Sequence, residues 1–314
     1  MSIEPTYQLD VISATAGYIP LKISRDAHDA LLNARKTILF GVSLEQRLDI
    51  VIENYITLQR FLLDLALQNS VFFGDASGRL KEGRHSLNRH LTNLLSSVRL
   101  YRDQTAHALS TQFGEDSPTY SQYVSETHHA YDNSLGYRCL EALRNYVQHR
   151  GMPAHSIIFS SALDEDEKVG EAKTTKARRR HFVAFSLIPK NLRLDGGFKS
   201  KVLRELEEKA NRKGKVDLMP MIQDYVSGIA RIHQSIRISV SLELESADAH
   251  VENMFKEIQA QTGHHCASAR IWQITGREMD RTGEINLEWI KGRKSYMEKN
   301  AYVASLRHHY ASSQ

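Results

Sequence analysis

Hydrophobic residues recur every three or four positions along much of the first half of this chain. One such stretch runs to about Ser70, with apolar positions at Leu44, Leu48, Val51, Tyr55, Leu58, Leu62 and Leu65. A second stretch is spaced in the same way, at Leu87, Leu91, Leu94, Leu95, Val98 and Tyr101. This period places the apolar side chains on one face of a helix. The pattern therefore predicts two long amphipathic helices.

Polar residues mark the expected starts of these helices. Ser43, followed by Gln46 three residues later, has the form of a capping box and predicts the start of the first helix. Ser117 and Pro118 have the form of an N-cap with proline at the first helical position. They predict a third helical segment that starts at residue 118.

The third segment extends to Arg150, with a bend expected near residues 132–134. Gly151 is the expected C-cap, and Pro153 prevents the helix from continuing. Long helices joined by short loops are typical of an antiparallel bundle. The first half of the chain is therefore predicted to be a helical bundle.

Period-two patterns predict strands at the N-terminus and after the bundle. Residues 7–12 and 18–23 alternate as strands do, and a polar helical pattern follows at residues 25–35. Residues 156–159 and 181–188 are rich in β-forming side chains and flank a charged insert. This pair predicts a β-hairpin with a long, charged tip.

The last third of the chain returns to helical patterns. Helices are predicted at residues 199–213 and at 216–261, the latter interrupted only by Gly228. One side of the longer helix offers an apolar surface for a partner, formed by Ile222, Tyr225, Val226, Ile229 and Ile232. Residues 270–274 and 285–289 flank the turn-like residues 280–283 and predict a second hairpin.

The fold class predicted from these patterns is mainly α, an antiparallel helical bundle with added β-hairpins and a long helix in the C-terminal half. The change of pattern near residue 153 predicts two domains. Residues 1–152 form the bundle, and residues 153–314 form the first hairpin, the later helices and the terminal hairpin. Elements of the second part can pack back on the bundle.

Composition narrows the class of protein. Hydrophobic residues make up 41% and charged residues 25% of the chain, as in ordinary globular proteins. No apolar run approaches the roughly 20 residues of a membrane span, and the N-terminus lacks the form of a signal peptide. Cys139 and Cys266 are too few for a disulfide framework. We therefore expect a cytoplasmic protein without a membrane segment.

Basic residues gather in one place although the net charge is only +4. The acidic run at residues 164–167 precedes a basic group made of Lys173, Lys176, Arg178, Arg179 and Arg180. This segment is either a solvated loop whose two halves attract each other or a loop that contacts the phosphates of a nucleic acid.

Arg144, Asn145 and His149 form the candidate active site. They lie on the last turns of the third helical segment, where Asn145 and His149 are one turn apart and share a face. Histidine can move the proton of a 2′-hydroxyl or of a leaving oxygen near neutral pH. Arginine can stabilise a phosphorane, and asparagine can orient the phosphate or the imidazole. This set suits RNA cleavage without a metal or cofactor.

This arrangement resembles the HEPN superfamily, in which a helical bundle has an arginine, a polar residue and then a histidine four to six residues after the arginine. Arg144, Asn145 and His149 match these places, and the resemblance covers residues 43–152. It implies a metal-independent endoribonuclease of a toxin or antiphage system, and a homodimer in which two motifs form one composite site. RNA is then the substrate, and a protein partner or inhibitor is conceivable.

Other interpretations of these residues remain open. Arg102 and His107 repeat the same form on the second helix, and Arg150 precedes His155 at a similar spacing. Short motifs of this kind also arise by chance. His149 and Arg150 can simply interact with the dipole at a helix end. In that case the chain is a non-catalytic helical scaffold or binding module within a multi-protein system.

Overall fold

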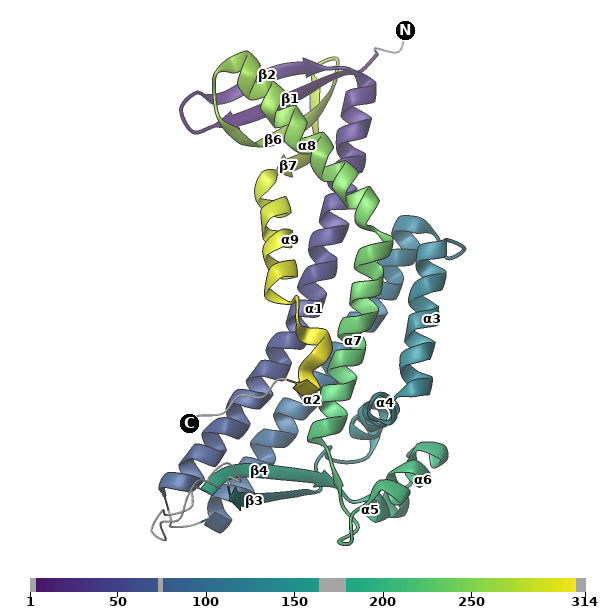
Figure 1. The fold of residues 1–314 in the computed structure, drawn as a ribbon. Coiled ribbons are helices and arrows are strands. Elements are labelled where there is room, and N and C mark those ends of the chain that lie inside the picture. Colours follow the sequence, from purple (N-terminus) through teal and green to yellow (C-terminus); the bar gives the residue numbers. More distant parts are fainter. Residues whose placement is uncertain (1–3, 73–75, 164–178, 309–314) are drawn as a thin grey trace, which may run out of the picture. The chain divides into compact units, whose positions relative to one another are not determined.

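The computed structural model describes residues 4–72, 76–163 and 179–308, most of which are helical. Figure 1 shows the elements, which are β1 (Thr6–Ser13), β2 (Gly17–Ile23), α1 (Arg25–Val71), α2 (Ala76–Phe113), α3 (Pro118–Asn133), α4 (Leu135–His149), β3 (Ser156–Leu163), β4 (Arg179–Leu187), α5 (Pro189–Asp195), α6 (Ser200–Lys209), β5 (Val216–Asp217), α7 (Met219–Ser239), α8 (Ser241–Thr262), β6 (Cys266–Thr275), β7 (Glu278–Asn286), α9 (Leu287–Lys299) and the 3₁₀ helix η1 (Val303–His308). The prediction of a mainly α fold with a minor β part is confirmed.

The chain forms two compact units, each assembled from separate segments. Unit 1 contains Met1–Asp49, Gln104–Tyr123 and His233–Ala301, and unit 2 contains Ile50–Asp103, Val124–Ile232 and Tyr302–Gln314. Helices α1, α2, α3 and α7 each begin in one unit and end in the other. Residue 153, where the pattern of the sequence changes, lies inside unit 2, because that unit holds both the preceding helices and the hairpin that follows.

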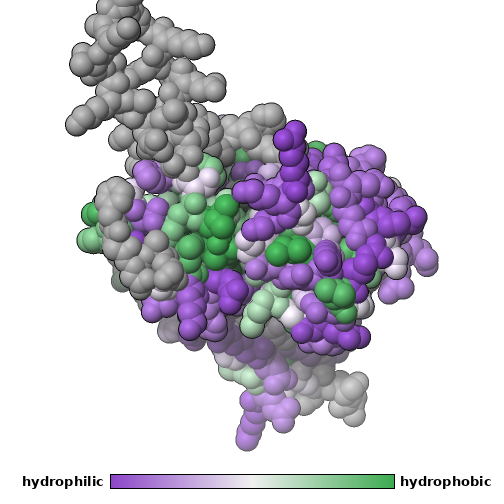
Figure 2. Space-filling view, turned by 90° about the horizontal axis from the view of Figure 1, so that it is seen from below, coloured by the Kyte–Doolittle hydropathy of each residue, from purple (hydrophilic) through white to green (hydrophobic). Residues whose placement is uncertain are grey.

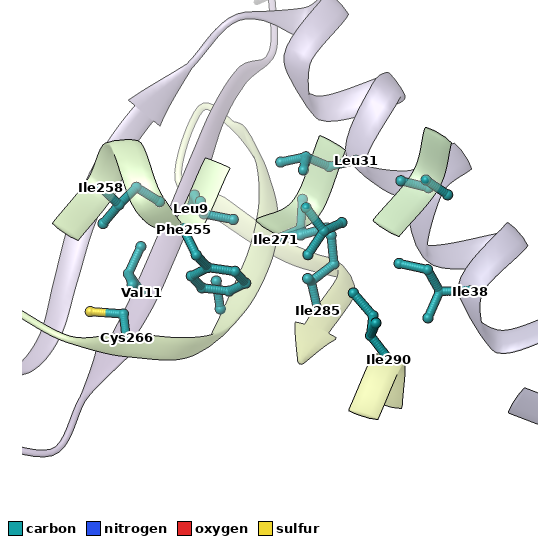
Figure 3. Packing of buried hydrophobic residues seen from close by; sticks show 14 residues of the cluster. Leu9, Val11, Leu31, Ile38, Phe255, Ile258, Cys266, Ile271, Ile285 and Ile290 are labelled. Atoms are coloured by element: carbon teal, nitrogen blue, oxygen red, sulfur yellow. The ribbon is translucent and has the colours of Figure 1, made fainter. Parts of the chain in front are cut away.

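Unit 1 is built on a four-stranded antiparallel sheet, sheet A, with the strand order β2-β1-β6-β7. Its inner face holds Leu9, Val11 and Ile271, which are buried because strand residues alternate between the two faces. Figure 3 shows these side chains packed against residues of α1, α8 and α9, among them Phe255 and Ile290. Helices therefore cover one face of sheet A and exclude water from it.

Unit 2 is a helical bundle with a small three-stranded sheet, sheet B, in the order β3-β4-β5. The apolar residues at helical spacing in α1 and α2 are buried, as the pattern predicts. Helices α4 and α7 supply the rest of the bundle core with Tyr137, Leu140, Leu143, Ile222, Tyr225 and Val226. The helical bundle predicted for the first half of the chain thus also requires a helix from the second half.

Several predicted elements are confirmed. Strands β1 and β2 occupy the alternating N-terminal stretches, and β3 pairs with β4 from Ser156 opposite Ser186 onward. Helix α3 begins at Pro118, and the Ser117 hydroxyl accepts a hydrogen bond from the Tyr120 amide at 3.2 Å. These elements depend on local sequence, which explains why they can be predicted.

The expected helix start at Ser43 is wrong. Helix α1 runs without a break from Arg25 to Val71, and Ser43 lies inside it. The Ser43 hydroxyl donates to the carbonyl of Phe40 at 2.9 Å instead of capping a helix. A serine inside a helix often bonds to a carbonyl of the preceding turn in this way. The polar stretch at residues 25–35 and the apolar stretch after it therefore form one helix.

The long helix predicted at residues 216–261 is also wrong in its limits. Residues 216–217 form β5, and the chain breaks at Val240, between α7 and α8, rather than at Gly228. A Cβ atom at Gly228 would lie 3.0 Å from the Tyr137 ring, so glycine serves close packing between α7 and α4 there. The apolar side of α7 is buried in the bundle, and the partner surface predicted on it is wrong.

Two turns differ from the predicted ones. The second hairpin turns at Gly276, whose φ is 64°, so that Asp280–Gly283 belong to β7 and Trp289 belongs to α9. A glycine with positive φ turns the chain more easily than the polar run at residues 280–283. The bend expected at residues 132–134 is a complete break, because Ser134 caps the N-terminus of α4.

Candidate functional site

Helix α4 presents two different faces within unit 2. Its first turn is fixed by Ser134, whose hydroxyl accepts a hydrogen bond from the Tyr137 amide at 3.1 Å. The face toward the bundle is buried and consists of Gly136, Tyr137, Cys139, Leu140, Ala142, Leu143 and Tyr146. Burial of this face determines which residues of α4 remain accessible to a ligand.

Arg144, Asn145 and His149 all lie on the accessible side of α4. Asn145 and His149 are exposed, and Arg144 is half-buried. The Arg144 guanidinium donates a hydrogen bond to the Asn145 side-chain oxygen at 3.1 Å. His149 is the last residue of the helix and lies one turn beyond Asn145. The three predicted residues therefore lie at one accessible helix end.

The end of α4 is fastened to the segment around α5 through Tyr146. The Tyr146 hydroxyl donates to the Asp195 carboxylate at 2.6 Å, and its ring meets the rings of His155 and Phe198 at centroid distances of 6.3 and 6.2 Å. Burial, together with the hydrogen bond to Asp195, raises the pKa of Tyr146 to about 12. Tyr146 is therefore a neutral anchor that fixes the turn between Asn145 and His149.

Gly151 follows the helix but is not the left-handed cap predicted for it. Arg150 is the C-cap, with φ −136°, and Gly151 does not have a positive φ. A Cβ atom at Gly151 would lie 2.5 Å from the Tyr146 hydroxyl oxygen. Glycine is required here because a larger residue would displace the anchor, rather than because of its backbone freedom.

Further polar groups surround this helix end. Arg150 lies beside the Asp195 carbonyl, at 3.4 Å. The His155 Nδ1 accepts a hydrogen bond from the Ile188 amide at 3.1 Å, and burial lowers the pKa of His155. His155 is therefore neutral at pH 7, with its proton on Nε2. Because the C-terminal end of a helix has a partial negative charge, only side chains such as Arg144 can attract a phosphate here.

The second motif of the same form does not have the same setting. Arg102 forms an ion pair with Glu141, which also accepts a hydrogen bond from the buried Tyr225 hydroxyl. His107 is exposed on the same helix, whereas Arg102 is half-buried. Arg102 therefore links α2 to α4 within the bundle, and its guanidinium is already engaged by a carboxylate.

The basic loop falls mostly outside the described residues. Lys173, Lys176 and Arg178 belong to the segment that the structure does not describe. Arg179 and Arg180 begin strand β4, paired with Leu163 and Ala162. The predicted phosphate contacts of this group remain a prediction.

No family model, curated protein or solved structure matches this chain. Among the described residues, no helix combines the length and apolar content of a transmembrane span. The same residues include no cluster of three histidine, cysteine or acidic side chains that could hold a metal ion.

The sequence patterns did not reveal the residues that support the site. Tyr146 lies between the motif residues Asn145 and His149, but its partner Asp195 lies 49 positions away. The sequence indicates His155 only by its spacing from Arg150, and the fixed tautomer of His155 depends on an amide 33 positions away. Connecting these residues requires the knowledge that the segments around His155 and Asp195 meet at the end of α4.

Proposed function

We propose that this protein is a metal-independent endoribonuclease whose active site is the exposed end of α4. The observation that supports it is the hydrogen-bonded pair of Arg144 and Asn145 on the accessible face, with His149 one turn away. The opposite face of the helix is held by the core and by Tyr146. A rigid helix can hold catalytic groups in a fixed relation, which RNA cleavage requires.

Each residue has a defined part in the proposed reaction. His149 acts as general base or acid, taking the proton of the 2′-hydroxyl or giving one to the departing 5′-oxygen. Arg144 stabilises the negative charge of the phosphorane, and Asn145 positions the scissile phosphate. Two copies of the chain provide both a base and an acid, which is why we propose a homodimer with the two sites close to its axis.

The basic group that precedes and begins β4 holds the RNA backbone in this proposal. Each neutralised phosphate releases counterions, so RNA binding weakens steeply as salt increases. Substituting Lys173 and Lys176 is expected to reduce this salt dependence without abolishing cleavage.

The direct test is incubation of purified protein with mixed RNA in EDTA, followed by analysis of the product ends. Arg144→Ala/His149→Ala is the active-site variant. Arg84→Ala/His85→Ala is a matched control, because it removes the same two residue types from exposed positions of α2 in the same unit. Products with 2′,3′-cyclic phosphate and 5′-hydroxyl ends that disappear only in the active-site variant support the proposal.

Equal activity of both variants, or no cleavage of several RNAs by the folded protein, would contradict the proposal.

The second candidate function is a protein-binding module. Leu63, Leu67 and Val71 lie four residues apart on α1 and are 45%, 59% and 59% exposed. Figure 2 shows hydrophobic areas among hydrophilic ones on the side that it views. An exposed apolar row of this kind can bind a partner or an inhibitor.

A further inference from the structure

Sheet A has a second face, opposite the core of unit 1. Leu9 and Val11 of β1 point into the core, so Gln8, Asp10 and Ile12 point to the other side. The register of the sheet places further side chains on this outer face, namely Tyr18, Pro20 and Lys22 of β2, Arg270, Trp272 and Ile274 of β6, and Met279, Arg281 and Glu284 of β7. In Figure 1, α8 lies against the opposite face of these strands.

Aromatic and apolar side chains are accessible on this outer face. Tyr18 is 56% exposed and Met279 is 50% exposed, whereas Trp272 and Ile274 are half-buried. Trp272 lies opposite Gln8 of β1 and Arg281 of β7, in the middle of the sheet. A tryptophan and a tyrosine on an open sheet offer flat surfaces on which planar ligands can stack.

The charges on the outer face have an excess of one positive charge, which favours an anionic ligand. The cations are Lys22, Arg270 and Arg281, and the carboxylates are Asp10 and Glu284. Asp10 accepts a hydrogen bond from Gln8 at 2.6 Å, and Glu284 is paired with Arg281. The guanidinium of Arg270 lies over the Tyr18 ring, 4.9 Å from its centroid. Arg270 is therefore next to the Tyr18 ring, although the register also places it between Asp10 and Glu284. Lys22 lies opposite Gln8, whose other neighbour in the sheet is Trp272.

From these observations we infer that the outer face of sheet A binds single-stranded nucleic acid. Bases stack on Tyr18 and Trp272, while Lys22 and Arg270 contact the phosphates. Exposed aromatic side chains on a sheet with cations beside them suit unpaired bases, because every base has a flat face whatever its sequence. The four strands span roughly 15 Å, which is enough for two or three stacked bases. The inference concerns binding by unit 1 and does not depend on cleavage at α4.

Binding can be measured with ligands that cannot be cleaved. Fluorescein-labelled ten-nucleotide 2′-O-methyl oligo(U) and oligo(dT) are titrated with the full chain, and anisotropy gives the affinity for each. The two ligands distinguish RNA-like from DNA-like preference. The three cations on the face should contribute a slope of about −2 at most to the fall of log K with log [salt].

The Tyr18→Ala/Arg270→Ala variant should bind roughly 5- to 150-fold more weakly, which is the loss expected for one stacked base. Tyr302→Ala/Arg204→Ala is the matched control, because both of its residues are exposed in unit 2 and it removes the same chemical groups. The control should bind as the native chain does. Equal losses in the two tyrosine/arginine variants would overturn the inference.

A second measurement uses tryptophan fluorescence in a variant whose outer face is unchanged. The chain has two tryptophans, so in Trp289→Phe the fluorescence comes from Trp272 alone. Stacking of a base on Trp272 should quench this fluorescence with the same midpoint as the anisotropy titration. Binding of the oligonucleotides without quenching would show that they bind elsewhere, and no binding at 100 µM protein would equally refute the proposed face.

Discussion

A buried charged cluster in unit 1 offers a sharp test of how this protein is stabilised. Glu45 on α1 is 2% exposed and forms an ion pair with Arg237 on α7, and the imidazole of the fully buried His233 lies 3.2 Å away. Burial raises the pKa of Glu45, but the contacts with His233 and Arg237 outweigh it and hold the pKa below its usual value. Glu45 is therefore a charged group inside the protein at neutral pH.

Removing the arginine should be far more harmful than removing the glutamate. In Arg237→Met the carboxylate of Glu45 stays buried without its main partner, which costs about 3–5 kcal/mol. In Glu45→Met the arginine remains, and its 17% exposed side chain can turn toward water. We therefore expect about 1–2 kcal/mol for that variant, and a similar value for Glu45→Met/Arg237→Met, in which no charge is left buried.

Tryptophan fluorescence during urea unfolding at pH 8 measures these differences. Trp272 and Trp289 both lie in unit 1, so the signal reports on the unit that holds the cluster. With a slope of roughly 2–3 kcal/mol per molar urea, the midpoint of Arg237→Met should fall by about 1–2 M. A loss below 1 kcal/mol in Arg237→Met would refute the reasoning. A double variant as unstable as the sum of the two single variants would do the same.

Three further predictions follow from local geometry and charge. Gly151→Ala should lower stability by about 1–3 kcal/mol and reduce RNA cleavage, since its methyl group would collide with the Tyr146 hydroxyl, 2.5 Å from the Cβ position. Thermal melting measures the first effect and the cleavage assay the second. Unchanged melting temperature and cleavage would show that the methyl group is accommodated without a collision. Gly292→Ala, with open space around it inside α9, should instead stabilise the chain by about 0.5–1 kcal/mol in the same melting experiment. Burial and the nearby arginines lower the pKa of His233, so the contribution of neutral His233 to stability should be fully present above about pH 6.5 and decrease on acidification. The contribution of ionised Glu45, whose pKa is lowered, should be lost in turn below about pH 4.5. A urea midpoint that does not change between pH 7.5 and 5 would count against this assignment.

The local pattern was sufficient for many elements of the fold. Alternation predicted β1 and β2, and the helical period identified the buried faces of α1 and α2. Ser117 and Pro118 were enough to start α3. These features depend on neighbours within about one helical turn or one strand, so the sequence contains what is needed to infer them.

The sequence indicated the helix end that carries the proposed site, but not the surroundings of that helix end. Asn145 and His149 could be placed on one face of it from their spacing, with Arg144 beside Asn145. Their support by Tyr146 and Asp195 requires that α4 and the segment at α5 meet in space. Spacing likewise could not show that Arg102 is engaged by Glu141 on another helix.

Only the tertiary structure decided the contacts between segments that lie far apart in the chain. Sheet A joins residues 6–23 to residues 266–286, and the units combine segments from both halves, so a boundary read from the change of pattern near residue 153 could not describe them. The face of α7 that could have bound a partner is instead buried in the bundle. Periodicity shows that a face is apolar, and only the fold determines whether the protein itself covers it.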